Sequence, residues 1–565
     1  MQATACSAPS KMPHKPVFFR PPLLNISHCF PAAGTFRASD ERIIQLYRKA
    51  ERYIDYPCMW EGLFRIACLL KNKPAEEAVA ARIIQGIEGT DNGAFTGSLS
   101  EQISIARAAF ALFEYNTDRS ILKRISEWLR YVEIEFDTIS IQDDTLFCPA
   151  DLMELLVRFY QSSGIKSALR LCARLRAEAF DWTTSLHTFQ QSIPIHTDDK
   201  SPARISLSGR PRDMDYSDKQ RLINHAELLA DGVRYSLFAG LFSGHAQDLS
   251  AGKSVWDHLV RYHHALCGGT TGNPYLSGNG SDQPVCNTAL SAWTEAFSAQ
   301  LITRDSFWAA DELIRIVFNG LDDCLNSTEP ADIQQINCLN HDAEVKDPVR
   351  LYARLSRAVS AAYSHSISLT ETGFRINYLL PGRMILMIGK QPVVIYMDTG
   401  TVRFQCKNAF TASVEMYLSS INSCSVSLIR AGSQADENSN KKQTSPGSCI
   451  RIDREWNDQD IICFIPENNV LSMDTHHHGI AFFASNRLLC MKADMDNYAT
   501  AVFADAAFDC GHFSVSAAKT DKWHIKGGQP SDIPVLPETK GDARKIELTE
   551  YSSEAGRISM FPRAR

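Results

Sequence analysis

The feature that most constrains the fold is a change in the spacing of apolar residues along the 565-residue chain. From Ser39 to about Ala362, apolar residues recur every three or four positions, as in DERIIQLYRKAERYI, which predicts amphipathic helices. From about Ser366, segments such as GRMILMIGKQPVVIYMDTG are short and apolar between Gly, Asn and Pro, which predicts strands. A dozen or so helices with paired spacing would form a toroid of helical hairpins whose loops gather at one end.

These patterns predict an α+β multidomain fold. We expect a disordered, proline-punctuated leader over residues 1–38 and an (α/α) barrel domain over 39–362. An antiparallel β-sandwich or jelly roll would follow over 363–518, packed against the toroid. A polar tail rich in Pro and Gly would cover 519–565.

Composition narrows the classes of function. A net charge of −7 gives no basic footprint for nucleic acid, and no run approaches 18 apolar residues, so we expect no membrane span. The sixteen cysteines lack paired spacing and the first residues lack an apolar signal segment. Both features favour reduced thiols and a cytoplasmic protein. We expect a small-molecule substrate as the partner and make no prediction of oligomeric state.

Several short motifs follow one another in a fixed order over roughly residues 50–405. They are Trp60-Glu61-Gly62, a Gly-rich loop from Asp91 to Gly97, Ala150-Asp151, Asn224-His225, His264 with Gly268-Gly269, Pro284-Val285-Cys286 and Gln334-Gln335-Ile336-Asn337. Their order resembles that of the β-L-arabinofuranosidases of glycoside hydrolase family 127. Each motif alone is weak, but the shared order favours the fold of that family.

The resemblance implies a zinc-bound thiolate nucleophile, held by one Glu and three Cys, with a second Glu as acid. Pro284 stands at the position of the ligand Glu, and proline cannot bind a metal. After Asn337 only Cys338 appears where the family has a Cys pair. Cys267, Cys286, Cys338 and His341 lack the spacing of a zinc site, so we expect no metal and no cofactor, with Cys286 packing as a small apolar residue.

The resemblance also places histidines where the family has sugar-binding imidazoles. We predict His225 and His264 as catalytic, ahead of His263, because a neutral imidazole both donates and accepts near pH 7. Glu61 would be a general acid if burial raised its pKa, and otherwise a helix N-terminal carboxylate. Residues predicted to bind substrate are Trp60, Tyr216, Tyr275, Trp293, Gln335 and Asn337, although aromatic stripes are more often part of a core.

Three functions stay open. The first hypothesis is a non-hydrolytic enzyme of specialised-metabolite biosynthesis, a cyclase, cycloaddition enzyme or isomerase that orients its substrate. The second is a β-L-arabinofuranosidase-type glycoside hydrolase, and the third a non-catalytic carbohydrate-binding protein. The run His476-His477-His478 would be a surface strand end, since neighbouring strand residues point to opposite faces.

Overall fold

The fold of the chain is given by a computed structural model. It describes residues 30–31, 36–38, 41–88, 92–139, 144–193, 210–279, 284–303, 306–326, 333–335, 346–370, 372–388, 391–398, 400–419, 424–430, 442–443, 447–466, 471–474, 479–484, 486–492, 514–517, 523–526, 545–551, 557–559 and 561–562.

Six of the described helices contact one another in a closed cycle, which we call the ring. Each packs against the next in this order, and the last packs against the first: α2 (Pro57–Leu70), α4 (Leu99–Asn116), α6 (Ala150–Ser163), α10 (Ala226–Ser243), α12 (Asn287–Gln300) and α15 (Pro348–Ser364).

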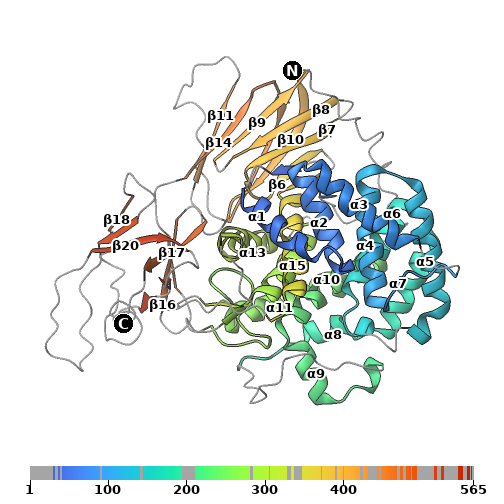
Figure 1. Ribbon diagram of the computed structural model, residues 1–565. Coiled ribbons are helices and arrows are strands. Elements are labelled where there is room, and N and C mark those ends of the chain that lie inside the picture. The colour runs from blue at the N-terminus through green and yellow to red at the C-terminus, as the bar shows by residue number, and fades with distance from the viewer. Residues whose placement is uncertain are drawn as a thin grey trace, which may run out of the picture.

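The helices between the ring helices in sequence pack on the outside of their neighbours (Figure 1). They are α1 (Glu41–Ala50), α3 (Lys73–Ile87), α5 (Arg119–Ile139), α7 (Lys166–Glu178), α8 (Trp182–His187), α9 (Tyr216–Ile223), α11 (Ala246–Tyr262), α13 (Phe307–Arg315) and α14 (Leu321–Asn326). A π-helical segment over Ile316–Gly320 joins the last two.

The ring helices are more completely buried than the outer helices, and the apolar pattern of each sequence agrees with this difference. Helix α5 buries Ile121, Ile125, Leu129 and Phe136 along one stripe, as expected for an outer helix. Helix α12 is buried at nearly every position, because neighbours surround it. Several helix ends carry capping residues: Ser98 closes a capping box at the start of α4, and glycines in the left-handed region end α6 and α10.

Two sheets lie above the helices in the view of Figure 1. One has the order β1 (Phe30–Pro31), β5 (Ile367–Leu369), β6 (Gly373–Ile376), β10 (Phe410–Tyr417) and β13 (Cys449–Trp456). The other has the order β12 (Lys442–Gln443), β11 (Cys424–Ile429), β14 (Ile461–Pro466), β9 (Thr401–Cys406), β8 (Gln391–Met397), β7 (Gly382–Ile388) and β2 (Phe36–Ala38).

Apolar side chains join these two sheets. Phe404 on β9 lies 4.7 Å from the ring of Trp456 on β13 and 6.1 Å from that of Phe374 on β6, between ring centroids. The prediction of a wholly antiparallel C-terminal part is wrong at one place, because β6 and β10 pair in parallel. Two strands that are not joined by a hairpin can pair in either direction.

A third sheet lies beside the helices (Figure 1). Its main path runs β15 (Leu471–Asp474), β16 (Gly479–Ala484), β17 (Arg487–Lys492), β20 (Lys545–Glu550), β19 (Trp523–Lys526) and β18 (Ser514–Ala517), with β21 (Arg557–Ile558) on β17 and β22 (Phe561–Pro562) on β16. The last four strands in sequence therefore lie within the stretch predicted as a tail, and β1 and β2 lie within the stretch predicted as a leader. Short strands next to Gly and Pro give little periodicity to detect.

No helix within these ranges is both long and apolar enough to cross a membrane. The three histidines from 476 to 478 lie outside the described residues.

Candidate active site

The ring helices run in the same direction where their charges meet. Glu61 on α2 pairs with Arg107 on α4, and further along both helices Arg65 pairs with Glu114. The same forward step relates α10 to α15, where Glu227 pairs with Arg350 and Asp231 with Arg354. Pairs that advance together on both helices require the two helices to be parallel, so these N-terminal ends gather at one end of the ring, which we call the mouth.

A buried ion-pair network crosses the ring behind the mouth. Arg234 is 1% exposed and contacts carboxylates on three ring helices, including Glu295 at 2.9 Å. Arg357 reaches Asp151 at 3.1 Å and Glu295 at 3.3 Å. Within the described chain the network holds seven arginines and seven acids: Arg65, Arg107, Arg158, Arg234, Arg350, Arg354, Arg357, Glu61, Glu114, Asp151, Glu154, Glu227, Asp231 and Glu295.

Asp151 differs from the other acids of this network. Its side chain keeps 28% of its surface exposed, more than any other of the seven carboxylates. Burial opposes ionisation of Asp151, but the guanidinium groups of Arg107 and Arg357 hold its pKa well below the usual range. Asp151, near the start of α6, is therefore an ionised carboxylate that keeps part of its surface accessible.

His225 and Tyr275, both predicted as site residues, are in contact at the mouth. His225 is the N-cap of α10, and its Nδ1 accepts a hydrogen bond from the Leu228 N–H at 3.5 Å. Its ring lies edge-on to Tyr275, with centroids 5.7 Å apart. Burial lowers the pKa of His225 to about 4, so the ring is neutral near pH 7. Tyr275 is buried, and its hydroxyl makes no hydrogen bond with the described part of the chain.

Cys286 directly precedes α12 on the same side of the ring. Its Sγ lies 3.1 Å from the Thr288 hydroxyl, and burial raises the pKa of the thiol, so it stays protonated near pH 7. Pro284 lies two residues earlier on β3 (Pro284–Cys286), which pairs with β4 (Ile333–Gln335). A proline at the position of the ligand Glu does not fit the zinc–thiolate site that the resemblance to family 127 implies. Among the residues described, no three His, Cys, Asp or Glu side chains are grouped to hold a metal ion.

Glu61 lies in a setting that opposes the predicted role of general acid. Its carboxylate accepts from Arg107 at 2.7 Å and from Arg65 at 3.1 Å. Burial favours the protonated form, but the arginines outweigh it and hold the pKa of Glu61 far below its ordinary value. A carboxyl group that stays ionised near neutral pH has no proton to donate.

The other predicted residues have partners of their own in the fold. Trp60 is buried and donates to the Ile54 carbonyl at 2.7 Å, and Tyr216 is 76% exposed on α9. His264 contacts Glu312 at 2.9 Å. Trp293 is fully buried and donates to the Thr270 hydroxyl at 3.0 Å, as expected for a core aromatic residue.

Trp256 lies between His264 and Trp293, with ring centroids 5.8 Å and 5.1 Å away. Gln335 on β4 pairs with Pro284 on β3. Asn337, Cys338 and His341 lie outside the described residues.

The sequence of the ring helices carries a signal for the ion-pair network, although one helix alone does not identify it. Charges recur at helical spacing on otherwise apolar segments, as in Glu227, Asp231 and Arg234, or Arg350, Arg354 and Arg357. A charged stripe of this kind usually marks a solvated face. Here each stripe faces the stripe of another ring helix, which the pattern of one helix cannot reveal.

No family model matches the chain, and no curated protein matches its sequence. Solved structures do resemble it. One described as a glycoside hydrolase has a TM-score of 0.69 at 11% identity, over 96% of this chain and 98% of the other. A GH127 β-arabinofuranosidase has a TM-score of 0.65 at 12% identity, over 95% and 98%.

A third structure, a GH127 β-L-arabinofuranosidase from Geobacillus stearothermophilus T6, has a TM-score of 0.64 at 12% identity, over 93% and 94%. The resemblance to family 127 predicted from the ordered motifs is thus confirmed at the level of the fold, and the chain shares a mixed helix-and-sheet architecture with these hydrolases over nearly its whole length.

Proposed function

We propose that the protein is an enzyme of the glycoside hydrolase type that acts on a sugar-bearing small molecule at the mouth of the ring. We also infer that the ring of helices is the predicted (α/α) toroid and that the two sheets joined through Phe404 are the predicted sandwich. The observation that carries the proposal is the coverage of 96% of this chain and 98% of a glycoside hydrolase, which leaves no major part of either without a counterpart.

The mouth offers groups suited to a sugar. Neutral His225 donates or accepts for a hydroxyl group, and Tyr275 brings an aromatic ring and a hydroxyl beside it. Asp151 supplies an exposed carboxylate that stays ionised. Glycoside cleavage builds positive charge on the sugar ring, and a fixed carboxylate stabilises such charge. In this proposal Asp151 acts as base or electrostatic stabiliser, and Cys286 takes no part as a nucleophile.

The experiment measures sugar release from a panel of nitrophenyl furanosides and pyranosides, including the β-L-arabinofuranoside. We expect release from at least one substrate, and a fall of about 100-fold or more in Asp151→Asn. The matched control is Glu154→Gln, which removes a charge facing the same Arg107 and Arg234 but has a less exposed side chain. If both variants lose rate equally, Asp151 contributes only to the fold.

A second candidate is the non-hydrolytic enzyme that orients its substrate for cyclisation or isomerisation. One observation favours it: near pH 7 three mouth groups keep a single charge state. His225 is neutral, Cys286 is protonated, and Arg350 and Arg354 outweigh burial and lower the pKa of Glu227 to about 2. Chemistry without proton transfer needs no titrating group.

Thermal-shift measurements with the same glycosides and with a set of apolar small molecules separate the candidates. Stabilisation by sugars with no release would support a non-catalytic carbohydrate-binding protein. No release, combined with stabilisation by apolar small molecules and not by sugars, would favour the orienting enzyme.

A further inference from the structure

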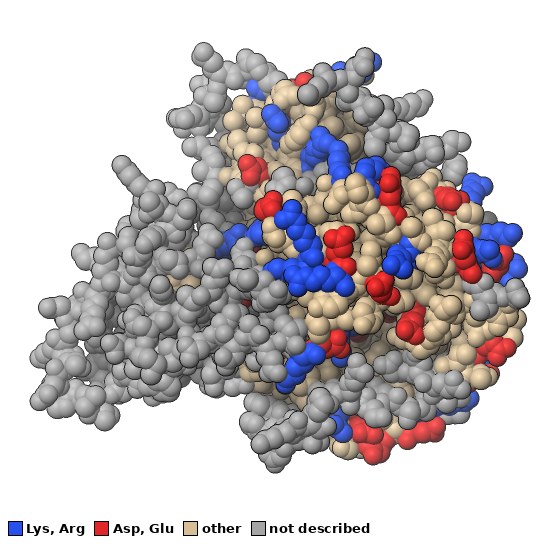
Figure 2. Space-filling model, in the orientation of Figure 1, with Lys and Arg blue, Asp and Glu red and all other residues tan. Residues whose placement is uncertain are grey.

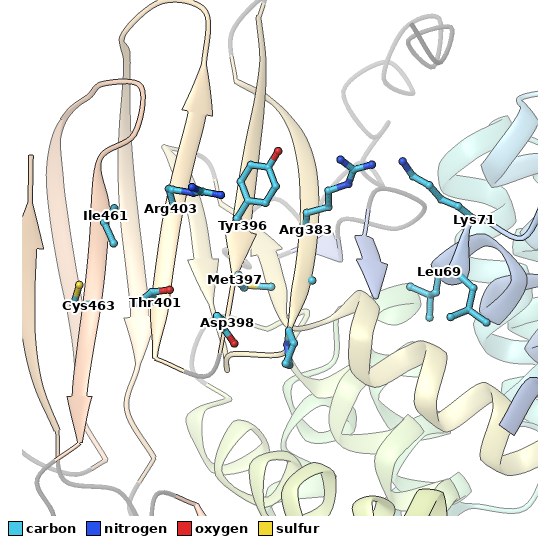
Figure 3. A pocket seen from close by; sticks show the side chains of 13 residues that line it. Leu69, Lys71, Arg383, Tyr396, Met397, Asp398, Thr401, Arg403, Ile461 and Cys463 are labelled. Atoms are coloured by element: carbon cyan, nitrogen blue, oxygen red, sulfur yellow. The ribbon is translucent and has the colours of Figure 1, made fainter. Parts of the chain in front are cut away.

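A cavity lies away from the mouth, between the C-terminal end of α2 and the seven-stranded sheet (Figure 3). Its volume of about 740 Å³ is within the range of small-molecule sites. Lys71 lies on the helix side, Arg383, Tyr396, Arg403 and Ile461 lie on the strands, and Asp398 directly follows β8. We call this cavity the basic groove, because its wall holds three cationic side chains and one carboxylate in a protein whose net charge is −7.

The strand side of the basic groove is a straight row across the sheet. Arg383 on β7 is in register with Tyr396 on β8, Tyr396 with Arg403 on β9, and Arg403 with Ile461 on β14. Residues in register point to the same face, so these side chains line one wall. Neighbouring strands lie about 4.8 Å apart, which sets the backbones of Arg383 and Arg403 about 10 Å from each other.

The two arginines of the row differ from the buried arginines of the ring. Neither Arg383 nor Arg403 has an ion pair or hydrogen bond through its guanidinium group within the described part of the chain, whereas each network arginine meets at least one carboxylate. Figure 3 shows the head groups of Arg383 and Lys71 pointing toward each other across the gap. Figure 2 shows basic side chains gathered on this face, near the boundary between α1–α3 and strands β7 and β8.

The groove is held in shape by its own contacts. The guanidinium group of Arg403 lies 4.8 Å from the centre of the Tyr396 ring, a cation–π contact. The Tyr396 hydroxyl donates to Gln405 Oε1 at 2.8 Å, which fixes the ring. On the opposite face of the same strands, Ile395, Val402 and Phe404 are fully buried and anchor the sheet. Arg403 is therefore positioned before a ligand arrives, which reduces the entropy lost on binding.

We propose that the basic groove binds an organic oxyanion that carries at least two carboxylate or phosphate groups, with Arg383, Arg403 and Lys71 as its cationic contacts. Guanidinium groups suit both anions, because their forked donors match the paired oxygens of a carboxylate or phosphate. Leu69, which is buried, and Ile461, at the end of the row, give the groove apolar side chains for the body of the ligand. The site is separate from the mouth and does not depend on the reaction proposed there.

The test is isothermal titration calorimetry of the full-length protein with sodium pyrophosphate, with a trigalacturonate, and with an uncharged trisaccharide as control. We expect binding of at least one anion that weakens as salt is added, since exposed charges are screened. Binding of pyrophosphate alone would identify a phosphate ligand, and binding of trigalacturonate alone would identify an acidic saccharide. Failure of both anions to bind, or equal binding of the uncharged trisaccharide, would overturn the proposal.

Variants then locate the site. Arg383→Gln and Arg403→Gln should each raise the Kd of the bound anion at least about tenfold, because each loses a charge-assisted hydrogen bond. The matched control is Arg119→Gln, since Arg119 is exposed at the start of α5 and does not line the groove. An unchanged Kd in both groove variants, with circular dichroism confirming their fold, would place the anion elsewhere and refute the assignment.

Discussion

Replacing Arg234 by Met tests whether the ion-pair network holds the ring together. Arg234 is 1% exposed and meets Asp151, Glu154, Asp231 and Glu295. Methionine fills most of the volume but leaves these carboxylates without their shared cation. Breaking a buried pair from one side costs about 3–5 kcal/mol. That loss is a large part of the roughly 5–15 kcal/mol that stabilises a typical protein.

Hydrogen exchange read by mass spectrometry on peptides from α6, α10 and α12 is the appropriate assay, because it reports opening of the ring separately from the sheets. The expected loss corresponds to exchange faster by on the order of 100- to 5000-fold. Arg119→Met, on the exposed start of α5, should change stability by no more than about 0.5 kcal/mol. The double variant Arg234→Met with Glu295→Gln should lose less than the sum of the single losses, since it removes one of the uncompensated charges.

The pH dependence of stability provides a further test of the ion-pair network. Asp151 and Glu154 have pKa values lowered by their arginines against the effect of burial, so their contribution is present above the unfolded pKa and is lost as pH falls. The difference between wild type and Arg234→Met should therefore shrink as the solution is acidified. A difference below about 1 kcal/mol at pH 7, or one that grows on acidification, would refute the argument that the network is a stabilising and mutually dependent set.

Four further predictions concern the mouth. Cys286→Ala should keep most of any sugar release, because burial keeps the thiol protonated, and loss by orders of magnitude in a folded variant would restore Cys286 as a nucleophile. Purified protein should hold less than stoichiometric zinc by elemental analysis, since Pro284 offers no ligand. Glu61→Gln should lower the thermal midpoint without removing a limb of the pH–rate profile, and loss of a limb would make Glu61 the acid. The wild-type free energy of unfolding should fall as pH drops from 6.5 to about 4, because His225 binds a proton in the unfolded state but stays neutral when buried. Urea titrations of His225→Phe should show a weaker dependence of this free energy on pH.

The sequence predicted the helical part well because its outer helices expose one face. Helix α5 carries a clean apolar stripe, and the capping pattern of Ser98 and Glu101 marks the start of α4 within a residue. The parallel pairing of β6 with β10 was not predictable, because periodicity reports which face of a strand is buried and not which strand lies beside it. The strands at both ends of the chain are two to six residues long and depend on partners distant in sequence.

The candidate site was predicted in part for a similar reason. His225 and Tyr275 are brought together, since the loop before β3 returns to the start of α10. Trp60 and Trp293 belong to the core, because a large aromatic ring on a helix buried from several sides has no open face. The ionised state of Glu61 depends on Arg107, which is 46 residues away in sequence and adjacent only after folding.

The order of charges along the ring helices explains how so many buried ions coexist, and it also separates the two sites by charge. On α2, α6 and α10 the acids Glu61, Asp151 and Glu227 precede the arginines of the same helix. Each carboxylate therefore lies nearer the positive end of its helix dipole, and Glu61 precedes Arg65 by one turn, which is the favourable orientation of such a pair. The mouth thus presents carboxylates balanced by helix N-termini, which suits a neutral ligand that gains positive charge as it reacts. The basic groove has no such balance, so an anion that binds there should be a poor ligand for the mouth.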